Sequence, residues 1–310
     1  MIEIIKNTKI DFIGKRKFSF IFSGILILVG LTAFFLILLG KANLGIDFVG
    51  GAMILGNFDE YVSVNDLRSA LSAEGFGGAD IQSVSGETVP RNSFIIRTKG
   101  ESDIIGDSLL TDIIASRIKK RFPDNEFHID SVDDIGGAVG KTLQEQARWA
   151  VIFALLGILV YIWIRFDFRF GVAATIATFH DVLAVLGIYF LLHKEISLLL
   201  MTALLTLAGY SLTDTVVVYD RIRENLKQFR KRGDFAGTVN ASINEVLSRT
   251  IITTGTTLLA VLSLLIFGGE VLRDFSLALF FGILVGTYSS VFVASPVIVE
   301  WEKRSPRRFK

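Results

Sequence analysis

The sequence has 310 residues, of which 51% are hydrophobic, with a mean hydropathy of +0.54, a formal net charge of +1 and no cysteine. The lack of cysteine excludes disulfides and thiolate metal sites, and the near-zero net charge gives no indication of nucleic-acid binding. The apolar residues gather in blocks of about 20, the length that crosses a hydrocarbon core of about 30 Å. The composition therefore predicts a multi-pass protein of a lipid bilayer.

Six apolar segments are long enough to cross a membrane. The first follows Lys15, Arg16 and Lys17, as the apolar part of a signal peptide follows its basic residues. It is longer than the roughly 7–15 residues usual for that part of a signal peptide, so we interpret it as an uncleaved transmembrane helix. The expected spans are 18–39, 149–165, 170–192, 197–219, 250–268 and 274–298.

Basic residues lie on one side of this arrangement. They gather near the N-terminus, in the turn after the second span, between the fourth and fifth spans and in the C-terminal tail, whereas the opposite short loops hold only Lys194 and Arg273. Because short cytoplasmic loops are rich in Lys and Arg, we predict that both termini are cytoplasmic. The predicted parts are a cytoplasmic N-terminus 1–17, helix 18–39, a periplasmic domain 40–148, a five-helix region 149–298 with a cytoplasmic segment 220–249, and a basic cytoplasmic tail 299–310.

The exported domain has the residue pattern of a small α+β fold. Ser63 is a suitable N-cap for the first of its helices. The element order βαββαβ is the ferredoxin-like arrangement. The sequence of this domain shows no His/Asp cluster, nucleophile triad or phosphate loop, so it favours binding or leverage over catalysis, and no metal site is predicted. The expected strands are 52–58, 81–85, 93–98 and 127–132, and the expected helices are 64–74 and 109–122.

Asp214 is an acidic residue within the fourth expected span. A carboxylate in the hydrocarbon region is costly, and such residues usually face the interior of a helix bundle or a water-filled path. A carboxylate whose charge is balanced between burial and a nearby cation can take up and release a proton. We therefore predict a proton-relay role for Asp214. The alternative is a structural ion pair that holds two helices together.

Arg249 opens the fifth span and lies at a depth similar to that of Asp214, because the fourth and fifth spans are antiparallel. An Asp–Arg pair is geometrically reasonable there. Arg249 is equally reasonable as a residue that extends its charge to the membrane surface. The sequence leaves both interpretations open.

His180 and Asp181 are adjacent ionisable residues near the middle of the third span. Sequence neighbours point about 100° apart on a helix, so one of them is free to face the bundle while the other packs elsewhere. Histidine titrates near neutral pH, which suits a proton pathway. The alternative is a hydrogen-bonded packing role.

Small and hydroxyl residues mark the last two spans. Thr253 and Thr257, with their threonine neighbours, favour close helix packing, with a hydrated path as the second possibility. Gly282 and Gly286 form a GxxxG pattern, which is common and weakly specific. Ser289, Ser290 and the Ser295-Pro296 pair allow local backbone adjustment in the last span.

Two motifs resemble the SecF family of protein-export membrane proteins. The stretch 44–51, which contains Asp47, Phe48, Gly50 and Gly51, resembles the signature that opens the exported domain of that family. The stretch 209–225 resembles the fourth-span signature, and His180-Asp181 and Arg249-Thr250 also stand where the family has them. Thr213 occupies a position that is often Asn in the family, and its hydroxyl keeps hydrogen bonding available.

The resemblance implies a function that composition alone does not. SecF-family proteins pair with SecD in the bacterial inner membrane, and the complex is similar in architecture to resistance-nodulation-division exporters. The implied role is to use the proton-motive force to help the Sec translocation channel move unfolded polypeptides outward. This is not an enzyme activity and needs no cofactor, with protons as the coupling ion. The resemblance implies that Asp214 and Arg249 belong to the proton pathway, with His180 and Asp181 as further members.

Two other functions fit the residues. The chain can be half of a proton-driven exporter of small molecules or lipids, which requires an apolar substrate cleft in the exported domain. It can also be a passive membrane scaffold, in which Asp214 and Arg249 matter only for stability. The stretches 40–43 and 136–140, which flank the exported domain and contain glycine, are candidate hinges.

Overall fold

The computed structural model describes residues 8–84, 90–99, 110–228 and 234–306. The chain divides into two compact units. The helical unit consists of Met1–Ala42, Val151–Lys194 and Leu199–Lys310, and the sheet unit consists of Asn43–Ala150 and Glu195–Leu198. The short loop Glu195–Leu198 therefore belongs to the sheet unit although it lies far along the chain.

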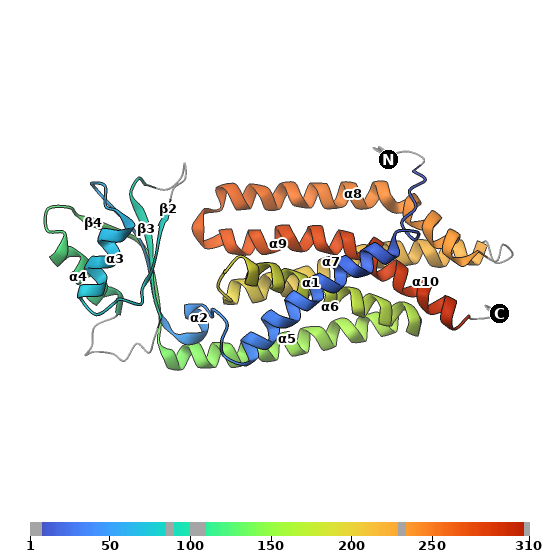
Figure 1. Ribbon diagram of the computed structural model, residues 1–310, viewed down its shortest axis with the longest axis horizontal. Helices are drawn as coiled ribbons and strands as arrows, with labels where there is room; N and C mark the ends of the chain where they lie inside the picture. Colours follow the sequence, from blue (N-terminus) through green and yellow to red (C-terminus); the bar gives the residue numbers. More distant parts are fainter. Residues whose placement is uncertain (1–7, 85–89, 100–109, 229–233, 307–310) are drawn as a thin grey trace. The chain divides into compact units, whose positions relative to one another are not determined.

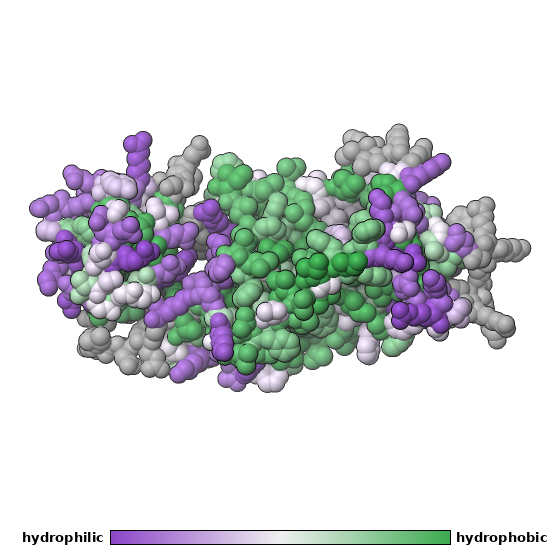
Figure 2. Space-filling view, in the orientation of Figure 1, coloured by the Kyte–Doolittle hydropathy of each residue, from purple (hydrophilic) through white to green (hydrophobic). Residues whose placement is uncertain are grey.

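Six helical segments among the described residues are long and apolar enough to cross a membrane, as predicted (Figure 1). Apolar side chains cover the visible surface of the helical unit, and hydrophilic residues gather toward the end that holds the start of α1 and the end of α10 (Figure 2). This surface suits a bilayer. The segments are α1 (Arg16–Leu38), α5 (Gly137–Arg165), α6 (Phe168–Leu191), α7 (Leu198–Gln228), α8 (Phe235–Phe267) and the last span Leu272–Arg304.

The helices extend beyond the expected spans. Both α7 and α8 run through most of the segment 220–249, so its described residues form mainly the ends of two spanning helices. The helix ends are joined by polar contacts: Asn225 Nδ2 donates to Ser242 Oγ at 2.9 Å, and Arg221 pairs with Glu245 at 2.5 Å.

The last span is not a continuous α-helix. It consists of α9 (Gly269–Ser289), a π-helical segment η1 (Ser290–Ala294) and α10 (Ser295–Arg304). Pro296 has no backbone N–H and its ring crowds the preceding turn, so α-helical hydrogen bonding is interrupted at this point. The Ser295 hydroxyl donates to the Ser290 carbonyl at 2.9 Å and compensates in part. The backbone adjustment expected near Ser295-Pro296 is therefore present, as a π-helix.

The sheet unit has the predicted ferredoxin-like fold. Its four-stranded sheet has the order β2-β3-β1-β4, and each neighbouring pair is antiparallel. Ser63 caps α3 as expected, since its Oγ accepts from the Asp66 backbone N–H at 3.1 Å. The elements are α2 (Ile46–Val49), β1 (Gly51–Phe58), α3 (Val64–Ala73), β2 (Asp80–Val84), β3 (Ser93–Lys99), α4 (Leu110–Arg121) and β4 (Phe127–Ile135).

Helices α3 and α4 of the sheet unit cover one face of its sheet (Figure 1). Ile54 of β1 and Ile96 of β3 are fully buried on that face, against Leu67 of α3 and Ile114 of α4. The strands alternate apolar and polar residues and the helices carry an apolar stripe, so the two patterns close around one core. Fully burying an aliphatic side chain contributes about 1.5–3 kcal/mol, and several such residues hold the unit together.

Close helix contacts in the helical unit occur at glycines. A Cβ on Gly30 of α1 would lie 2.1 Å from the Leu183 carbonyl oxygen of α6. On α9, a Cβ on Gly282 would meet Leu207 at 2.7 Å, and one on Gly286 would meet Ser211 at 3.0 Å. Gly282 and Gly286 thus form the face of α9 that packs on α7, where small residues let helix backbones approach in a membrane.

Candidate functional site

Asp214 of α7 lies among hydroxyl groups from two other spans. Its Oδ1 accepts a hydrogen bond from Thr250 Oγ1 of α8 at 3.1 Å, and its Oδ2 accepts one from Ser290 Oγ of η1 at 2.6 Å. Both donors are neutral, so the carboxylate is hydrogen-bonded without being neutralised. Arg249, one residue before Thr250, acts electrostatically on Asp214.

Asp181 of α6 is fully buried and has three hydrogen-bond donors. His180 Nδ1 lies 2.8 Å from its Oδ1. Asp181 Oδ2 accepts hydrogen bonds from Ser289 Oγ at 2.7 Å and from Ser211 Oγ. Donors from α6, α7 and α9 therefore meet at this carboxylate, and buried carboxyl groups require such partners.

His180 and Asp181 face the bundle together. The sequence allowed one to face the interior while the other packed elsewhere, but only 1% of His180 and none of Asp181 is exposed. Their separation of about 100° is bridged because Nδ1 lies close to the helix backbone and meets the next side chain. The other ring nitrogen, Nε2, is buried and has no hydrogen-bond partner among the described residues.

The two carboxylates are joined through consecutive residues. Ser289 donates to Asp181 and Ser290 donates to Asp214, so a single turn of the last span contacts both groups. Ser211 and Asp214 are three residues apart on α7, an axial rise of about 4.5 Å. Asp181, which Ser211 contacts, therefore lies roughly one helical turn from Asp214 in depth.

The other predicted site residues lie at the edge of this cluster. Arg249 is exposed and makes no ion pair with Asp214 within the 4.0 Å limit, in the part of the chain that the structure describes. Thr213 and Thr253 are exposed, and their hydroxyls donate to carbonyls of their own helices. Thr257 accepts from Tyr210 at 3.3 Å and so joins α8 to α7.

The sequence did not identify four of the contacting hydroxyls as site residues. Ser211 lies one turn before Asp214 within the fourth-span motif, and Thr250 directly follows Arg249, so both positions carried a signal. Ser289 and Ser290 were predicted only to adjust the backbone. Their contact with the carboxylates depends on the rotation of the last span about its axis, which the sequence pattern does not give.

The motif at the start of the sheet unit has a clear structural role. Gly50 has φ 77° and Gly51 has φ 139°, backbone conformations that favour glycine, and together they turn the chain from α2 into β1. Phe48 is buried, with 6% of its surface exposed. Asp47 Oδ2 accepts from the backbone N–H of Leu198, the first residue of α7, at 2.8 Å.

The loop Glu195–Leu198 is held to the sheet unit by further contacts. Ile196 N–H donates to the Asn43 carbonyl at 2.8 Å, and its own carbonyl accepts from Gly45 N–H at 2.9 Å. Glu195 pairs with Lys99 of β3 at 2.7 Å. The chain continues from this loop directly into α7, the helix that carries Asp214.

Comparisons with known proteins agree with this architecture. The family described as protein export membrane protein SecD/SecF, C-terminal, matches residues 113–304. The chain is 48% identical to the protein translocase subunit SecF of Thermodesulfovibrio yellowstonii over 306 residues, 98% of this chain and 99% of that protein. The chain belongs to the SecF family. It is also 42% identical to the SecF subunit of Calditerrivibrio nitroreducens, over 96% of each chain.

Solved structures of SecDF resemble this SecF-family chain. The crystal structure of SecDF from Thermus thermophilus, described as a translocon-associated membrane protein, has a TM-score of 0.80 and 37% identity over 96% of this chain. A crystal structure of SecDF in a super-membrane-facing form has a TM-score of 0.68 and 38% identity over 97% of this chain. The chain spans 39% and 40% of those two SecDF chains.

Membership of the SecF family defines the class of activity. The chain is a multi-pass translocase subunit that assists Sec-dependent protein export, which is transport and not enzymatic catalysis. Both carboxylates of the helical bundle lie within the residues that the family match covers.

One group in the sheet unit was not expected from the sequence. Asp59, Glu126 and His128 bring their ligand atoms within 4.8 Å of one another, although no His/Asp cluster was recognised there. They come together because β1 ends beside the start of β4. All three are exposed, and His128 Nε2 lies 3.1 Å from Asp59 Oδ1. Exposed acidic groups in such an arrangement are common without a bound ion.

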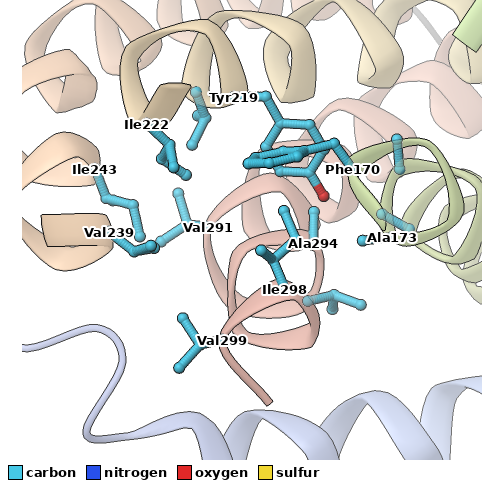
Figure 3. Packing of buried hydrophobic residues seen from close by; sticks show 14 of the residues in the cluster. Phe170, Ala173, Tyr219, Ile222, Val239, Ile243, Val291, Ala294, Ile298 and Val299 are labelled. Atoms are coloured by element: carbon cyan, nitrogen blue, oxygen red, sulfur yellow. The ribbon is translucent and has the colours of Figure 1, made fainter. Parts of the chain in front are cut away.

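An apolar core packs against the π-helix. Figure 3 shows Val291 and Ala294 of η1 among side chains from α6, α7 and α8. Tyr219 of α7 packs edge-on against Phe170 of α6, with ring centroids 5.1 Å apart. Ser290 lies immediately before this core in the sequence, so a change at Ser290 acts on a closely packed junction of helices.

Proposed function

We propose that this SecF-family chain couples proton movement across the bacterial inner membrane to Sec-dependent export, with Asp214 as the residue that takes up and releases the proton. The observation that carries the proposal is the pair of carboxylates, Asp214 and Asp181, held in the bundle by neutral donors. Ionisable residues in this position usually mark ion pathways. His180, which contacts Asp181, and Arg249, which acts electrostatically on Asp214, complete the proposed path.

The energy of a proton is sufficient for this role. Moving one charge through 100 mV releases about 2.3 kcal/mol. Protein conformers are often separated by a few kcal/mol, so one proton is able to change which of two conformers is populated. A cycle of protonation at Asp214 is then a cycle between two arrangements of the helices that contact it.

Transmission to the exported domain is proposed to run along α7. This helix carries Asp214 and begins at Leu198, which Asp47 of the sheet unit holds through its N–H. Gly40, with φ 66°, ends the first span and suits a hinge. Residues 137–140 of the second candidate hinge lie in the first turn of α5, so only Gly136 remains outside the helix there.

The proposed setting follows from the charges at the helix ends. Both termini lie in the cytoplasm because the basic residues gather near them, and the sheet unit then faces the periplasm. The partners we propose are a SecD subunit, the Sec channel and the unfolded polypeptide that the channel delivers. The similarity to SecDF chains of more than twice this length supports the pairing with SecD.

The test uses inverted inner-membrane vesicles that contain the chain, its SecD partner and the Sec channel. Export of a secretory protein is measured with an imposed proton gradient and after the gradient is collapsed by an ionophore. We expect the gradient to speed export only when the chain is present. An equal effect of the gradient on vesicles that lack the chain would refute the proposal, and accumulation of a lipid or drug with normal export would favour the exporter alternative.

Asp47 provides a second test, directed at transmission. Replacing it by alanine removes the side-chain acceptor at the start of α7, a loss of about 1 kcal/mol, or about fivefold in an equilibrium constant. We expect Asp47→Ala to lower gradient-driven export about fivefold at normal protein levels in the same vesicles. Asp47→Asn keeps an oxygen that accepts from Leu198 N–H, so it is the matched control and should export nearly normally. Equal losses of export in the two variants would contradict a role for the hydrogen bond from Leu198 N–H to Asp47.

A further inference from the structure

Ser289 and Ser290 each have two hydrogen-bond acceptors within reach of one hydroxyl proton. Ser289 Oγ lies 2.7 Å from Asp181 Oδ2 and 3.1 Å from the Gly286 carbonyl oxygen. Ser290 Oγ lies 2.6 Å from Asp214 Oδ2 and 3.0 Å from the Thr287 carbonyl oxygen. The same choice, between a carboxyl group and a carbonyl of the preceding turn, therefore occurs at two consecutive residues.

The protonation state of the carboxyl group decides which acceptor is used. A hydroxyl has one proton to donate and can also accept. An ionised carboxylate is the stronger acceptor, so the serine proton points toward it. When the carboxyl oxygen binds a proton, that O–H donates to the serine oxygen, and the serine proton turns to the helix carbonyl. Every group remains hydrogen-bonded in both states, which a buried carboxyl group requires.

We propose that Ser289 and Ser290 are paired hydroxyl switches, positioning residues that keep Asp181 and Asp214 hydrogen-bonded both with and without a proton. This inference rests on the proposed proton-relay function and extends it to two residues outside the predicted path. The only bond made or broken is the O–H bond of the carboxyl group: the proton stays on the carboxyl oxygen until the carboxyl group releases it. The serine keeps its own proton, which only changes direction.

The position of the two serines joins the switches to the backbone. Their alternative acceptors, the carbonyls of Gly286 and Thr287, are adjacent in the last turn of α9. The Ser290 carbonyl in turn accepts from Ser295 Oγ across the π-helix. A rotation of either hydroxyl therefore adds or removes a hydrogen bond at the junction between α9 and η1. In proteins generally, π-helical segments such as η1 are often found at functional sites. Val291 and Ala294 of η1 pack in the core shown in Figure 3, next to this junction.

The charged and titratable groups that face each switch differ. Asp181 has His180 beside it on α6, and the His180 ring lies 6.2 Å from that of Tyr288 of α9. Asp214 has Arg249 of α8 as the cation that acts on it. Ser289 thus serves an imidazole–carboxylate pair and Ser290 serves a carboxylate near a guanidinium, while one backbone segment carries both.

Infrared difference spectroscopy tests the switch at Ser290 directly. The full chain with its partner subunit in lipid is titrated with acid, and the carboxylic C=O band of Asp214 is identified by its loss in Asp214→Asn. We expect Ser290→Ala to move this band to higher wavenumber, because the protonated acid loses the serine oxygen to which it donates. Ser290→Thr keeps a hydroxyl and should restore the band position. Ser289→Ala should likewise move the carboxylic C=O band of Asp181 to higher wavenumber.

Transport provides the second measurement. We expect Ser290→Ala to slow gradient-driven export about tenfold at normal protein levels, and Ser290→Thr to recover most of the rate. Ser263→Ala is the matched control, because Ser263 is an exposed hydroxyl on α8 that donates only to the Leu259 carbonyl of its own helix, at 2.9 Å. In Ser263→Ala, the Asp214 band and the rate of gradient-driven export should remain unchanged.

The outcomes separate the two proposals. An unchanged Asp214 band in Ser290→Ala overturns the switch, and if Asp214→Asn still abolishes gradient-driven export, the proton-relay function stands. Loss of export in Ser290→Ala and in Ser290→Thr alike, without a band shift, assigns the serine to packing and overturns the switch as well. A chain in which no titrating band depends on Asp214 overturns both proposals.

Discussion

Replacing Asp214 by asparagine is expected to abolish the gradient-driven part of export while the protein remains inserted and folded. Asparagine has the shape of aspartate, and its amide oxygen still accepts from Thr250 or Ser290, so the contacts that hold α7, α8 and η1 together largely survive. It binds no proton near neutral pH, so the proposed cycle stops. The measurement is the ratio of export rates with and without the proton gradient, which should fall to about one.

The matched control is Asp220→Asn, six residues further along the same helix. Asp220 pairs with Arg165 at 2.5 Å, and both side chains are exposed. An exposed ion pair contributes about 0–1 kcal/mol, so this change should leave export almost normal. Gradient-driven export at the normal rate in Asp214→Asn would remove Asp214 from the proposed mechanism.

A double variant distinguishes a relay from a structural ion pair. If Asp214 and Arg249 served only to neutralise each other, Asp214→Asn with Arg249→Met would recover the function lost in each single variant. We expect no recovery, because Arg249 is exposed and forms no ion pair with Asp214 within 4.0 Å in the described residues. Thr250 and Ser290 already supply the donors that such a pair would provide.

The sequence was sufficient to predict the fold and the location of two carboxylates, Asp181 and Asp214, within membrane spans. Length and hydropathy define spans because a bilayer has a fixed thickness, and the strand and helix periods in the sheet unit differ enough to be distinguished. Asp181 and Asp214 stood out because an acidic residue inside an apolar helix is rare and costly. Each of these signals is local, so no knowledge of neighbouring helices was needed.

The hydroxyl partners were not predictable in the same way. Serine and threonine are common in transmembrane helices, since their side chains can donate to the carbonyl one turn earlier, as Thr213 and Thr253 do. Which hydroxyl faces inward depends on the rotation of each helix. Thr250 faces Asp214 while Thr253, three residues later, is exposed, and only the packing of the bundle decides between them.

The sheet-unit motif illustrates a second limit. The sequence identified Asp47 and the two glycines as a family signature but gave no reason for them. Asp47 acts on a residue 151 positions away, at the start of α7, and such a long-range contact leaves no local pattern. Gly50 and Gly51 are explained by positive φ angles and by the close approach of β3 and α5, which only a folded sheet unit provides.

Gly51→Ala is expected to destabilise the sheet unit by roughly 4 kcal/mol or more. The backbone at Gly51 has φ 139°, which L-residues rarely adopt, and an added Cβ would lie 2.0 Å from the Thr98 carbonyl oxygen of β3. Relieving that overlap requires β1 and β3 to separate where they pair. The measurement is the urea dependence of proteolysis of the sheet unit in the full chain, which gives its free energy of unfolding.

Two glycines of the same unit separate the two causes. Gly75 has φ 96° but nothing within 4 Å of an added Cβ, so Gly75→Ala measures backbone strain alone, about 1 kcal/mol. Gly78 has an ordinary φ and equally open surroundings, so Gly78→Ala should be neutral or slightly stabilising. The expected order of destabilisation is Gly51, then Gly75, then Gly78. A loss at Gly51 no larger than the loss at Gly75 would mean that β1 and β3 yield to the added methyl group, and the motif glycine would then be needed only for its backbone angle.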